Sequence, residues 1–110
     1  MGKDNHEDAW AAFRDPAVVH GMCEDYRAGL EIDRRHDEED RAAGRRIGCP
    51  TMLLESAYDD LDIHGDPAAI WAPWLEQQLE HRVIQSGHHQ AEEAPEEVAT
   101  ALLGFLASGH

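Results

Sequence analysis

Ile47-Gly48-Cys49-Pro50-Thr51-Met52-Leu53-Leu54 is a short apolar run in the middle of the chain, and it decides the fold class. The run shows no alternation of apolar and polar residues, which is typical of a strand buried on both faces of a parallel sheet. Pro50 is expected near the start of this strand, where a missing N–H donor is tolerated. The chain turns polar directly after Leu54. Asp59 and Asp60 are therefore expected just beyond the carboxyl end of the strand, where open α/β sheets build their sites.

One helix and one charged surface segment are predicted before this strand. Asp15-Pro16 is a helix-start signal, because Asp caps free amides and Pro is tolerated in the first turn. Apolar residues then recur at helical spacing, which predicts an amphipathic helix over residues 15–31. Residues 33–46 are nearly all charged, and Gly44 is a plausible stop signal, so any helix there has only a thin apolar edge.

The pattern after the strand predicts a second strand between helices. Asp66-Pro67 opens a helix expected to reach Leu79, although Pro73 should bend or interrupt it. Residues 82–85 are a second strand candidate, followed by a loop and by a last helix that begins near Ala94-Pro95. The alternation predicts an α/β fold with a parallel sheet. Two strands do not make a stable sheet alone, so the layer is expected to be incomplete.

Composition limits the classes of function. A chain of 110 residues can bury one modest core. Its formal charge of -14 repels nucleic acid phosphates and anionic lipid headgroups, so neither partner is expected. The acidity indicates a solvated surface, for instance in a salt-rich cytoplasm where salt screens the repulsion between the acidic groups. The alternative is a surface that binds a basic partner.

The cysteines and the N-terminus indicate a cytoplasmic location. Cys23 and Cys49 have no CxxC spacing and are expected to be reduced. The N-terminal sequence MGKDNHED is polar and lacks the apolar stretch of a signal peptide, and no segment is apolar for long enough to span a bilayer. We therefore expect a soluble cytoplasmic protein that does not bind a membrane.

His88 is the candidate general base. It lies in a loop between a predicted strand and a predicted helix, from which an imidazole can reach a cleft, and Gly87 would permit the tight turn. An imidazole can activate water near neutral pH, and a carboxylate on its other nitrogen fixes the tautomer. Asp59, at the end of the other strand, is the candidate for that carboxylate. Six further histidines are expected to be solvated surface groups, namely His6, His20, His36, His64, His81 and His110.

Several other kinds of site are not expected. His88 and His89 stand near Glu92 and Glu93, but the HExxH pattern and CxxC pairs are missing, so we predict no metal and no cofactor. Tyr26 and Cys23 fall on the apolar face of the first predicted helix, where packing is the ordinary role. The chain contains no GxSxG nucleophile elbow, P-loop or dinucleotide fingerprint.

Three stretches, in this order and spacing, resemble haloacetate (fluoroacetate) dehalogenases of the α/β-hydrolase superfamily. The resemblance extends from about Asp15 to Leu106. The first stretch is the most specific, whereas Gly-His before Glu-Glu-Ala-Pro is common to many α/β-hydrolases. The stretches are Met22-Cys23-Glu24-Asp25-Tyr26-Arg27-Ala28-Gly29, His36-Asp37 through Asp40 to Ala43-Gly44, and Ser86-Gly87-His88 with Glu92-Glu93-Ala94-Pro95-Glu96.

The resemblance implies a partial α/β-hydrolase fold. Residues 1–46 would be a cap-derived helical segment returning to the core, and residues 47–110 would supply the last two parallel strands and their helices. In that family an Asp on the nucleophile elbow displaces halide from a haloacetate, and a His-activated water hydrolyses the resulting ester to glycolate. His88 matches the catalytic His, and Tyr26 matches a tyrosine that donates a hydrogen bond to the departing halide. The elbow Asp and the substrate-clamping arginines match nothing in this chain.

The resemblance also shows departures at the site. In the most similar family members the acid that orients the His follows an earlier strand, whereas Asp59 matches the acid position of other α/β-hydrolases. Glu55-Ser56 stands where relatives often have an apolar residue and Gly. His89-Gln90 replaces apolar residues after the catalytic His.

The leading functional hypothesis is a truncated or split hydrolase that is inactive alone, since a His without a nucleophile has no covalent intermediate to resolve. Completed by an N-terminal half, it would act on a small haloacid. One alternative is a non-catalytic binding module that pairs with another chain or with itself through an exposed sheet edge. Another is part of an α/β-hydrolase of a different substrate class, such as an esterase or an epoxide hydrolase.

Overall fold

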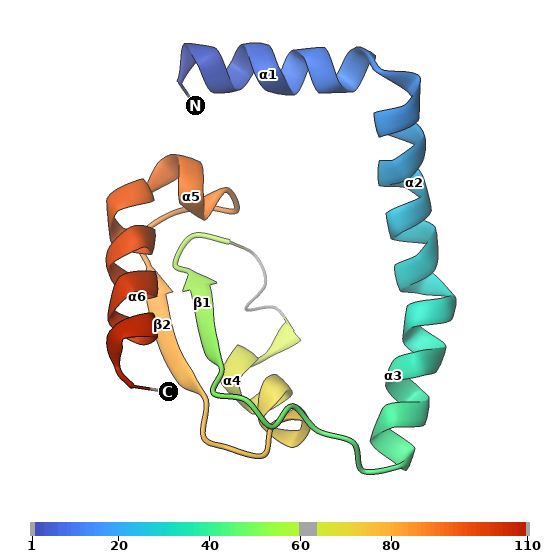
Figure 1. Cartoon of the computed structure of the whole chain (residues 1–110), viewed down its shortest axis with the longest axis vertical. Coiled ribbons are helices and arrows are strands. Elements are labelled where there is room, and N and C mark those ends of the chain that lie inside the picture. Colours follow the sequence, from blue (N-terminus) through green and yellow to red (C-terminus); the bar gives the residue numbers. More distant parts are fainter. Residues whose placement is uncertain (1, 60–63, 110) are drawn as a thin grey trace. The chain divides into compact units, whose positions relative to one another are not determined.

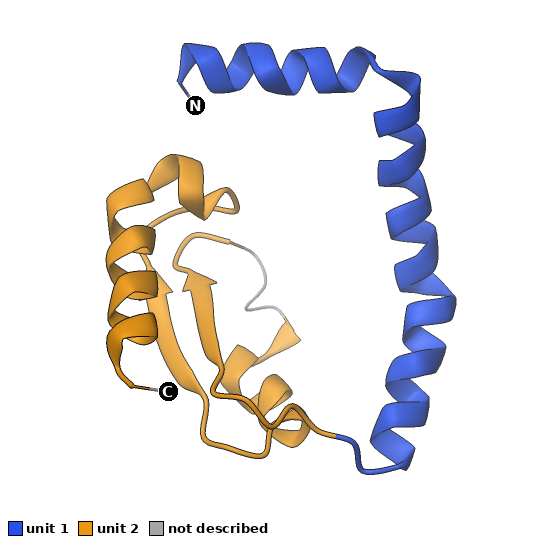
Figure 2. Ribbon diagram, viewed as in Figure 1, with its two compact units in different colours: residues 1–45 blue, residues 46–110 orange. Residues whose placement is uncertain are grey.

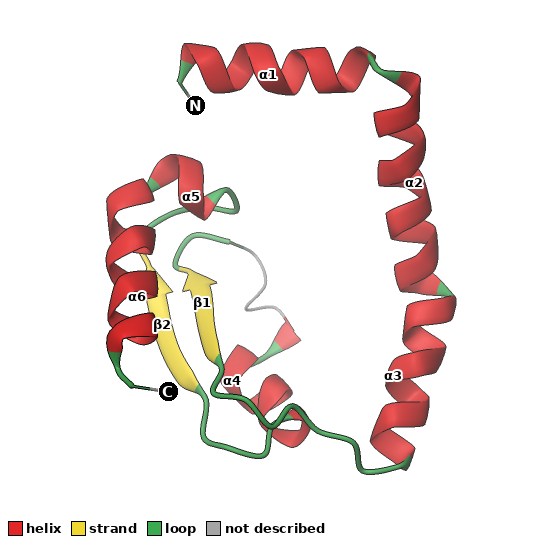
Figure 3. Cartoon of the chain, in the orientation of Figure 1, coloured by secondary structure: helices red, strands yellow, loops and turns green. Residues whose placement is uncertain are grey.

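The computed structural model describes residues 2–59 and 64–109. The chain divides into two compact units, residues 1–45 and residues 46–110 (Figure 2). The first unit is helical, and the second contains a small sheet with helices (Figure 3). Among the helices of the described ranges, none combines the length and the apolar character needed to cross a bilayer.

Unit 1 consists of α1 (Lys3–Arg14), α2 (Pro16–Leu30) and α3 (Ile32–Ala42) (Figure 1). The start of α2 confirms the helix-start signal, because the Asp15 carboxylate accepts a hydrogen bond from the Ala17 amide at 2.9 Å. Helix α1 is absent from the predicted elements. Its apolar residues lie only in its second half, after a stretch dominated by charged and polar side chains.

Gly44 ends α3 as the sequence predicts. Its φ of 70° is in the left-handed region that glycine adopts without strain. The Gly44 amide donates to the Arg41 carbonyl at 3.1 Å, and the Arg45 amide donates to the Asp40 carbonyl at 2.9 Å. This pair of bonds is a Schellman cap, which satisfies carbonyls that the last helical turn leaves open.

The apolar face predicted for α2 is exposed. None of the described residues of the three helices in unit 1 is buried. Cys23, expected to be a small packed residue, is exposed. Tyr26 and Leu30 are each 77% exposed. The expectation that these residues pack is therefore wrong within unit 1, because the unit provides no second layer to cover them.

Unit 2 contains two parallel strands, β1 (Met52–Ser56) and β2 (Glu80–Ile84), paired from Met52 with Glu80 to Ser56 with Ile84. This confirms the predicted parallel sheet. Strand β1 begins and ends later than the apolar run. Ile47, at the start of that run, instead forms an isolated bridge with Leu75. Pro50 separates the bridge from the strand, because it has no N–H for the ladder.

Strand β1 is only half-buried, which corrects the prediction of a strand buried on both faces. In the described part of the chain it pairs with β2 alone, so it lacks the second neighbouring strand and the covering layers of a complete parallel sheet. Within residues 46–59 and 64–109, the buried apolar residues are Leu75, Ile84 and Ala101.

Short helices complete unit 2. Helix α4 (Pro67–Trp71) begins where the sequence predicts, since the Asp66 carboxylate accepts from the Ala68 amide at 3.1 Å. The expected extension to Leu79 is wrong. The chain tightens into the 3-10 turn η2 (Ala72–Trp74) around Pro73 and then extends. Two further helices follow β2, the unpredicted turn α5 (Gln90–Glu93) and the predicted α6 (Pro95–Ala107), which packs against β2 (Figure 1).

Candidate active site

The candidate site lies at the carboxyl ends of the two strands. Because the strands are parallel, the loops that follow them leave the same edge of the sheet. The backbone joins these loops beyond the ladder. The Ala57 amide donates to the Ile84 carbonyl at 2.9 Å, and the Tyr58 amide donates to the Ser86 carbonyl at 3.1 Å. The loop after β1 is thus held against the loop after β2.

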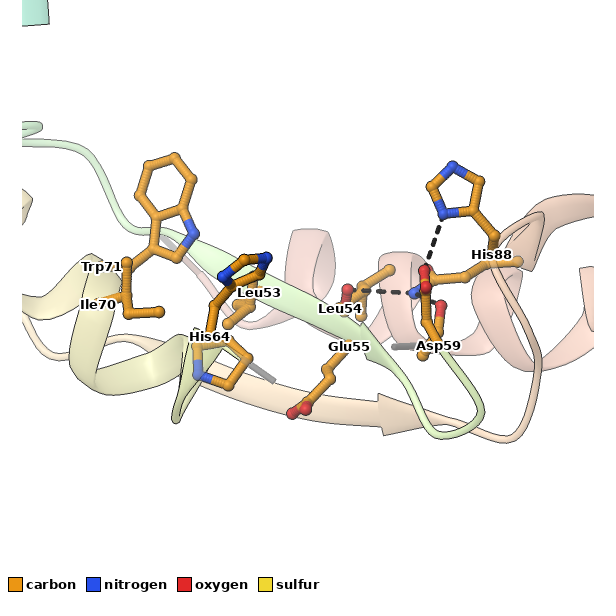
Figure 4. A pocket seen from close by; sticks show the side chains of 11 residues that line it. Leu53, Leu54, Glu55, Asp59, His64, Ile70, Trp71 and His88 are labelled. Atoms are coloured by element: carbon orange, nitrogen blue, oxygen red, sulfur yellow. Dashed lines mark hydrogen bonds and ion pairs between the residues drawn. The ribbon is translucent and has the colours of Figure 1, made fainter. Parts of the chain in front are cut away.

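His88 and Asp59 are in direct contact at this edge (Figure 4). The distance from His88 Nδ1 to Asp59 Oδ2 is 2.8 Å. The Asp59 side chain is 17% exposed, whereas the His88 side chain is 73% exposed. An ionised carboxylate can only accept a hydrogen bond, so in the neutral imidazole this contact assigns the proton to Nδ1 and leaves the Nε2 lone pair available. Asp60, the other carboxylate expected here, lies outside the described residues.

A cavity of about 360 Å³ opens beside this pair (Figure 4). Its walls are partly apolar, from the first half of β1 and from α4, and polar groups gather toward the strand ends. Such a combination suits a small ligand whose reacting end is polar. The lining residues are Leu53, Leu54, Glu55, Ser56, Asp59, His64, Pro67, Ile70, Trp71, His88 and Gln90.

Gly87 has a different role from the one expected. Its φ is not positive, so the turn itself does not require glycine. A Cβ at this position would lie 3.1 Å from Oε1 of Glu93, closer than nine in ten real Cβ contacts, so the Glu93 carboxylate would have to shift by a few tenths of an ångström. Glycine therefore allows a carboxylate to approach the backbone next to His88.

Gln90 is a site residue that the sequence marks only as a departure from the family pattern. Its Nε2 donates to the Leu54 carbonyl at 3.1 Å and to Ser56 Oγ at 2.8 Å. The carbonyl contact fixes the orientation of the amide, since a carbonyl oxygen needs a donor. Two departures, Ser56 and Gln90, are therefore bonded to each other, and they join the His88 loop to the end of β1.

Replacing Gln90 with Leu is expected to lower the free energy of unfolding by about 1–2 kcal/mol, because both hydrogen bonds are lost and the Leu54 carbonyl loses a donor. The measurement is urea unfolding of the chain. Gln78→Leu, at an exposed position, is the matched control and should change stability by less than about 0.5 kcal/mol. Equal effects of the two substitutions would contradict the account.

His81 and Glu55 form a second pair that the sequence does not reveal. His81 Nε2 lies 2.6 Å from Glu55 Oε2, and the two side chains are 30% and 24% exposed. His81 is exposed, as expected of a surface histidine, and the parallel register brings the Glu55 carboxylate next to it. The Glu55 side chain points away from the Asp59–His88 pair (Figure 4).

Two further predictions concern Tyr26 and metal binding. Tyr26 lies on α2 in unit 1, and its role in binding halide stays a prediction. Within residues 2–59 and 64–109, no group of three or more His, Cys, Asp or Glu side chains is arranged to hold a metal ion.

Comparisons with known proteins agree on the kind of fold. No protein-family model matches the chain. A fluoroacetate dehalogenase from Burkholderia sp. is 33% identical over 94 residues, which are 86% of this chain and 30% of that protein. A putative epoxide hydrolase from Pseudomonas aeruginosa has a solved structure that is 42% identical, with a TM-score of 0.88, over 98% of this chain and 36% of that one. A mutant of it, solved with bound MFA, matches with the same values.

These likenesses confirm the predicted partial α/β-hydrolase fold. The chain spans about a third of the length of the relatives it matches.

Proposed function

Since the chain corresponds to the C-terminal portion of an α/β-hydrolase, we propose that it supplies the water-activating histidine of a haloacetate dehalogenase. The observation that carries this proposal is the 2.8 Å contact between His88 and Asp59 beside a cavity at the strand ends. In this proposal His88 is the general base, and Asp59 orients it. The nucleophile comes from residues other than these 110.

The proposed reaction has two steps. A carboxylate nucleophile attacks the α-carbon of a haloacetate, forms a carbon–oxygen bond and expels halide, which leaves an ester. His88 Nε2 then takes a proton from water as the water oxygen attacks the ester carbonyl. The ester breaks to glycolate and the free carboxylate, and the proton returns to solvent. Asp59 stabilises the imidazolium that forms in between.

Tyr26 has a proposed part in the first step. A phenolic O–H is a good donor to an anion, and a donor aimed at the leaving halide stabilises charge as it develops in the transition state. The support for this role is the match of the stretch around Tyr26 to the dehalogenase pattern.

Hydrolysis of an epoxide is the second candidate, favoured by the 42% identity to the putative epoxide hydrolase from Pseudomonas aeruginosa. A carboxylate can open an epoxide to an ester, and the same histidine-activated water then completes the reaction. The His88–Asp59 pair activates water in the same way for the ester formed from a haloacetate and for the ester formed from an epoxide. The choice of substrate therefore depends on groups outside these residues and on the cavity.

The proposal is tested by mixing this chain with a partner polypeptide that supplies the rest of the fold. The partner polypeptide is the part of the Burkholderia fluoroacetate dehalogenase outside its 94 matched residues. Fluoride release from fluoroacetate and opening of a terminal epoxide are measured for the mixture. The proposal predicts fluoride release by the mixture. A stable complex that opens the epoxide and releases no fluoride supports the second candidate, and a complex inactive on both substrates contradicts both.

The isolated chain is expected to release fluoride no faster than buffer does, because no nucleophile elbow occurs in its sequence. A fluoride electrode provides the measurement, and the reconstituted mixture is the positive control. Sustained fluoride release by the purified 110-residue chain would refute the assignment of its role.

Asp59→Asn is expected to slow ester hydrolysis in the reconstituted enzyme by roughly tenfold to a hundredfold. It removes a charge-assisted hydrogen bond that stabilises the imidazolium, a contribution of about 1.5–3 kcal/mol. The decay of the ester intermediate in a single turnover provides the rate. Asp8→Asn, on exposed α1, is the control and should leave the rate unchanged. An equal rate in both variants argues against Asp59 as the orienting acid.

A further inference from the structure

The carboxylate of Glu93 holds the backbone on both sides of His88. The Gly87 amide donates to Glu93 Oε1 at 3.1 Å, and the His89 amide donates to Glu93 Oε2 at 3.1 Å. Each carboxylate oxygen therefore takes one of the two amides that flank His88 in the chain. Hydrogen bonds to an ionised acceptor are about twice as strong as neutral ones.

A backbone hydrogen bond also joins Glu93 to His89. The Glu93 amide donates to the His89 carbonyl at 3.0 Å, so Glu93 is bound to both the N–H and the C=O of His89. Gly87 leaves the space that this arrangement requires, because a Cβ there would lie 3.1 Å from one carboxylate oxygen and 3.2 Å from the other. Two hydrogen bonds and one close approach thus depend on the position of the Glu93 side chain, and a third hydrogen bond involves the Glu93 backbone.

The His88 ring needs such support from its own backbone. Its side chain is 73% exposed, so packing does little to restrict the torsion angles of the residue. The bond to Asp59 restrains only the Nδ1 side of the ring. A loop residue of this kind keeps a fixed geometry only when its backbone is held.

We propose that Glu93 is a positioning residue for His88, a role that rests on the proposed function of His88 as general base. By fixing the amides of Gly87 and His89, Glu93 sets the backbone from which the imidazole meets Asp59. The neighbouring Glu92 provides a natural comparison. It is exposed, and within the described residues its side chain makes no hydrogen bond or ion pair.

The test compares Glu93→Ala and Glu93→Gln with Glu92→Ala and Glu92→Gln in the 110-residue chain. Two properties are measured by nuclear magnetic resonance, the hydrogen exchange rates of the Gly87 and His89 amides and the tautomer of the His88 ring. We expect Glu93→Ala to raise both exchange rates by about tenfold or more. We also expect the ring to change from one tautomer, protonated on Nδ1, to a mixture.

Glu93→Gln should give an intermediate result, because the amide oxygen of Gln can accept from one of the two backbone amides. The Glu92 variants should match the unaltered chain in both properties. Thermal melting of each variant shows whether unit 2 remains folded. If Glu93→Ala unfolds the chain, the comparison between Glu93→Gln and Glu92→Gln gives the result.

Three outcomes overturn the proposal. Exchange rates unchanged in the Glu93 variants would show that the carboxylate does not hold the loop. Faster exchange with an unchanged His88 tautomer would show a purely structural role. If the Gly87 and His89 amides of the unaltered chain exchanged as fast as those of a free peptide, the two hydrogen bonds to the Glu93 carboxylate would not hold the loop. These measurements use neither a partner nor a substrate, so their failure is distinct from a failed reconstitution.

Discussion

His88→Gln is expected to reduce multiple turnover in the reconstituted enzyme by about 10²- to 10⁴-fold, the usual contribution of a positioned general base. Gln cannot take a proton from water, so the ester formed by the first displacement persists. Intact-protein mass spectrometry after incubation with fluoroacetate should detect the added carboxymethyl group on the partner polypeptide.

The matched control for this substitution is His89→Gln. The His89 ring lies next to His88 in an edge-to-face arrangement, with the ring centroids 5.3 Å apart, so the change alters the same loop without removing the base. It should retain turnover to within about threefold, as expected for a group outside the reaction. Full turnover by the His88→Gln enzyme would remove the chemical basis of the proposed function.

Ile84→Ala is expected to abolish the cooperative unfolding transition of the isolated chain or to lower the free energy of unfolding by about 2–5 kcal/mol. Ile84 is 1% exposed, and its side chain is the largest fully buried one among the residues that the structure describes. Small domains are stable by only about 5–15 kcal/mol, and few apolar residues are buried in the described part of this chain, so the loss is a large share of the total. Urea unfolding followed by circular dichroism gives the measurement.

Val83→Ala is the control for the core substitution. Val83 precedes Ile84 in β2, points to the opposite face of the sheet, and is 47% exposed. Its replacement should lower stability by less than about 1 kcal/mol. Losses of similar size for the two variants would show that the core is not centred on Ile84.

The sequence predicts those elements that depend on local signals. The Asp15 and Asp66 caps and the glycine stop at Gly44 act through bonds to residues close by in the chain, so their patterns are visible in the sequence. The parallel order of the two strands also follows from the alternation of helices and strands. Pro73 interrupts a helix as expected, because the effect of a missing N–H is local.

The features that the sequence does not reveal depend on contacts between distant residues. The pairing of Glu55 with His81 and that of Gln90 with Ser56 each follow from the three-dimensional arrangement of loops and strands. The half-burial of β1 depends on which strands and layers surround it. The contact of Asp59 with His88 is the exception, because both residues follow parallel strands and therefore meet at the same edge.

The ratio of glycolate to fluoride released by the reconstituted enzyme is the most direct test of the claim that this chain resolves the ester. With the unaltered chain, the two products should appear in equal amounts over many turnovers. With His88→Gln, fluoride should stop near one ion per complex, about the stoichiometry of a trapped covalent intermediate, and glycolate should be absent. Equal amounts of glycolate and fluoride from the His88→Gln enzyme, over many turnovers, would contradict the account.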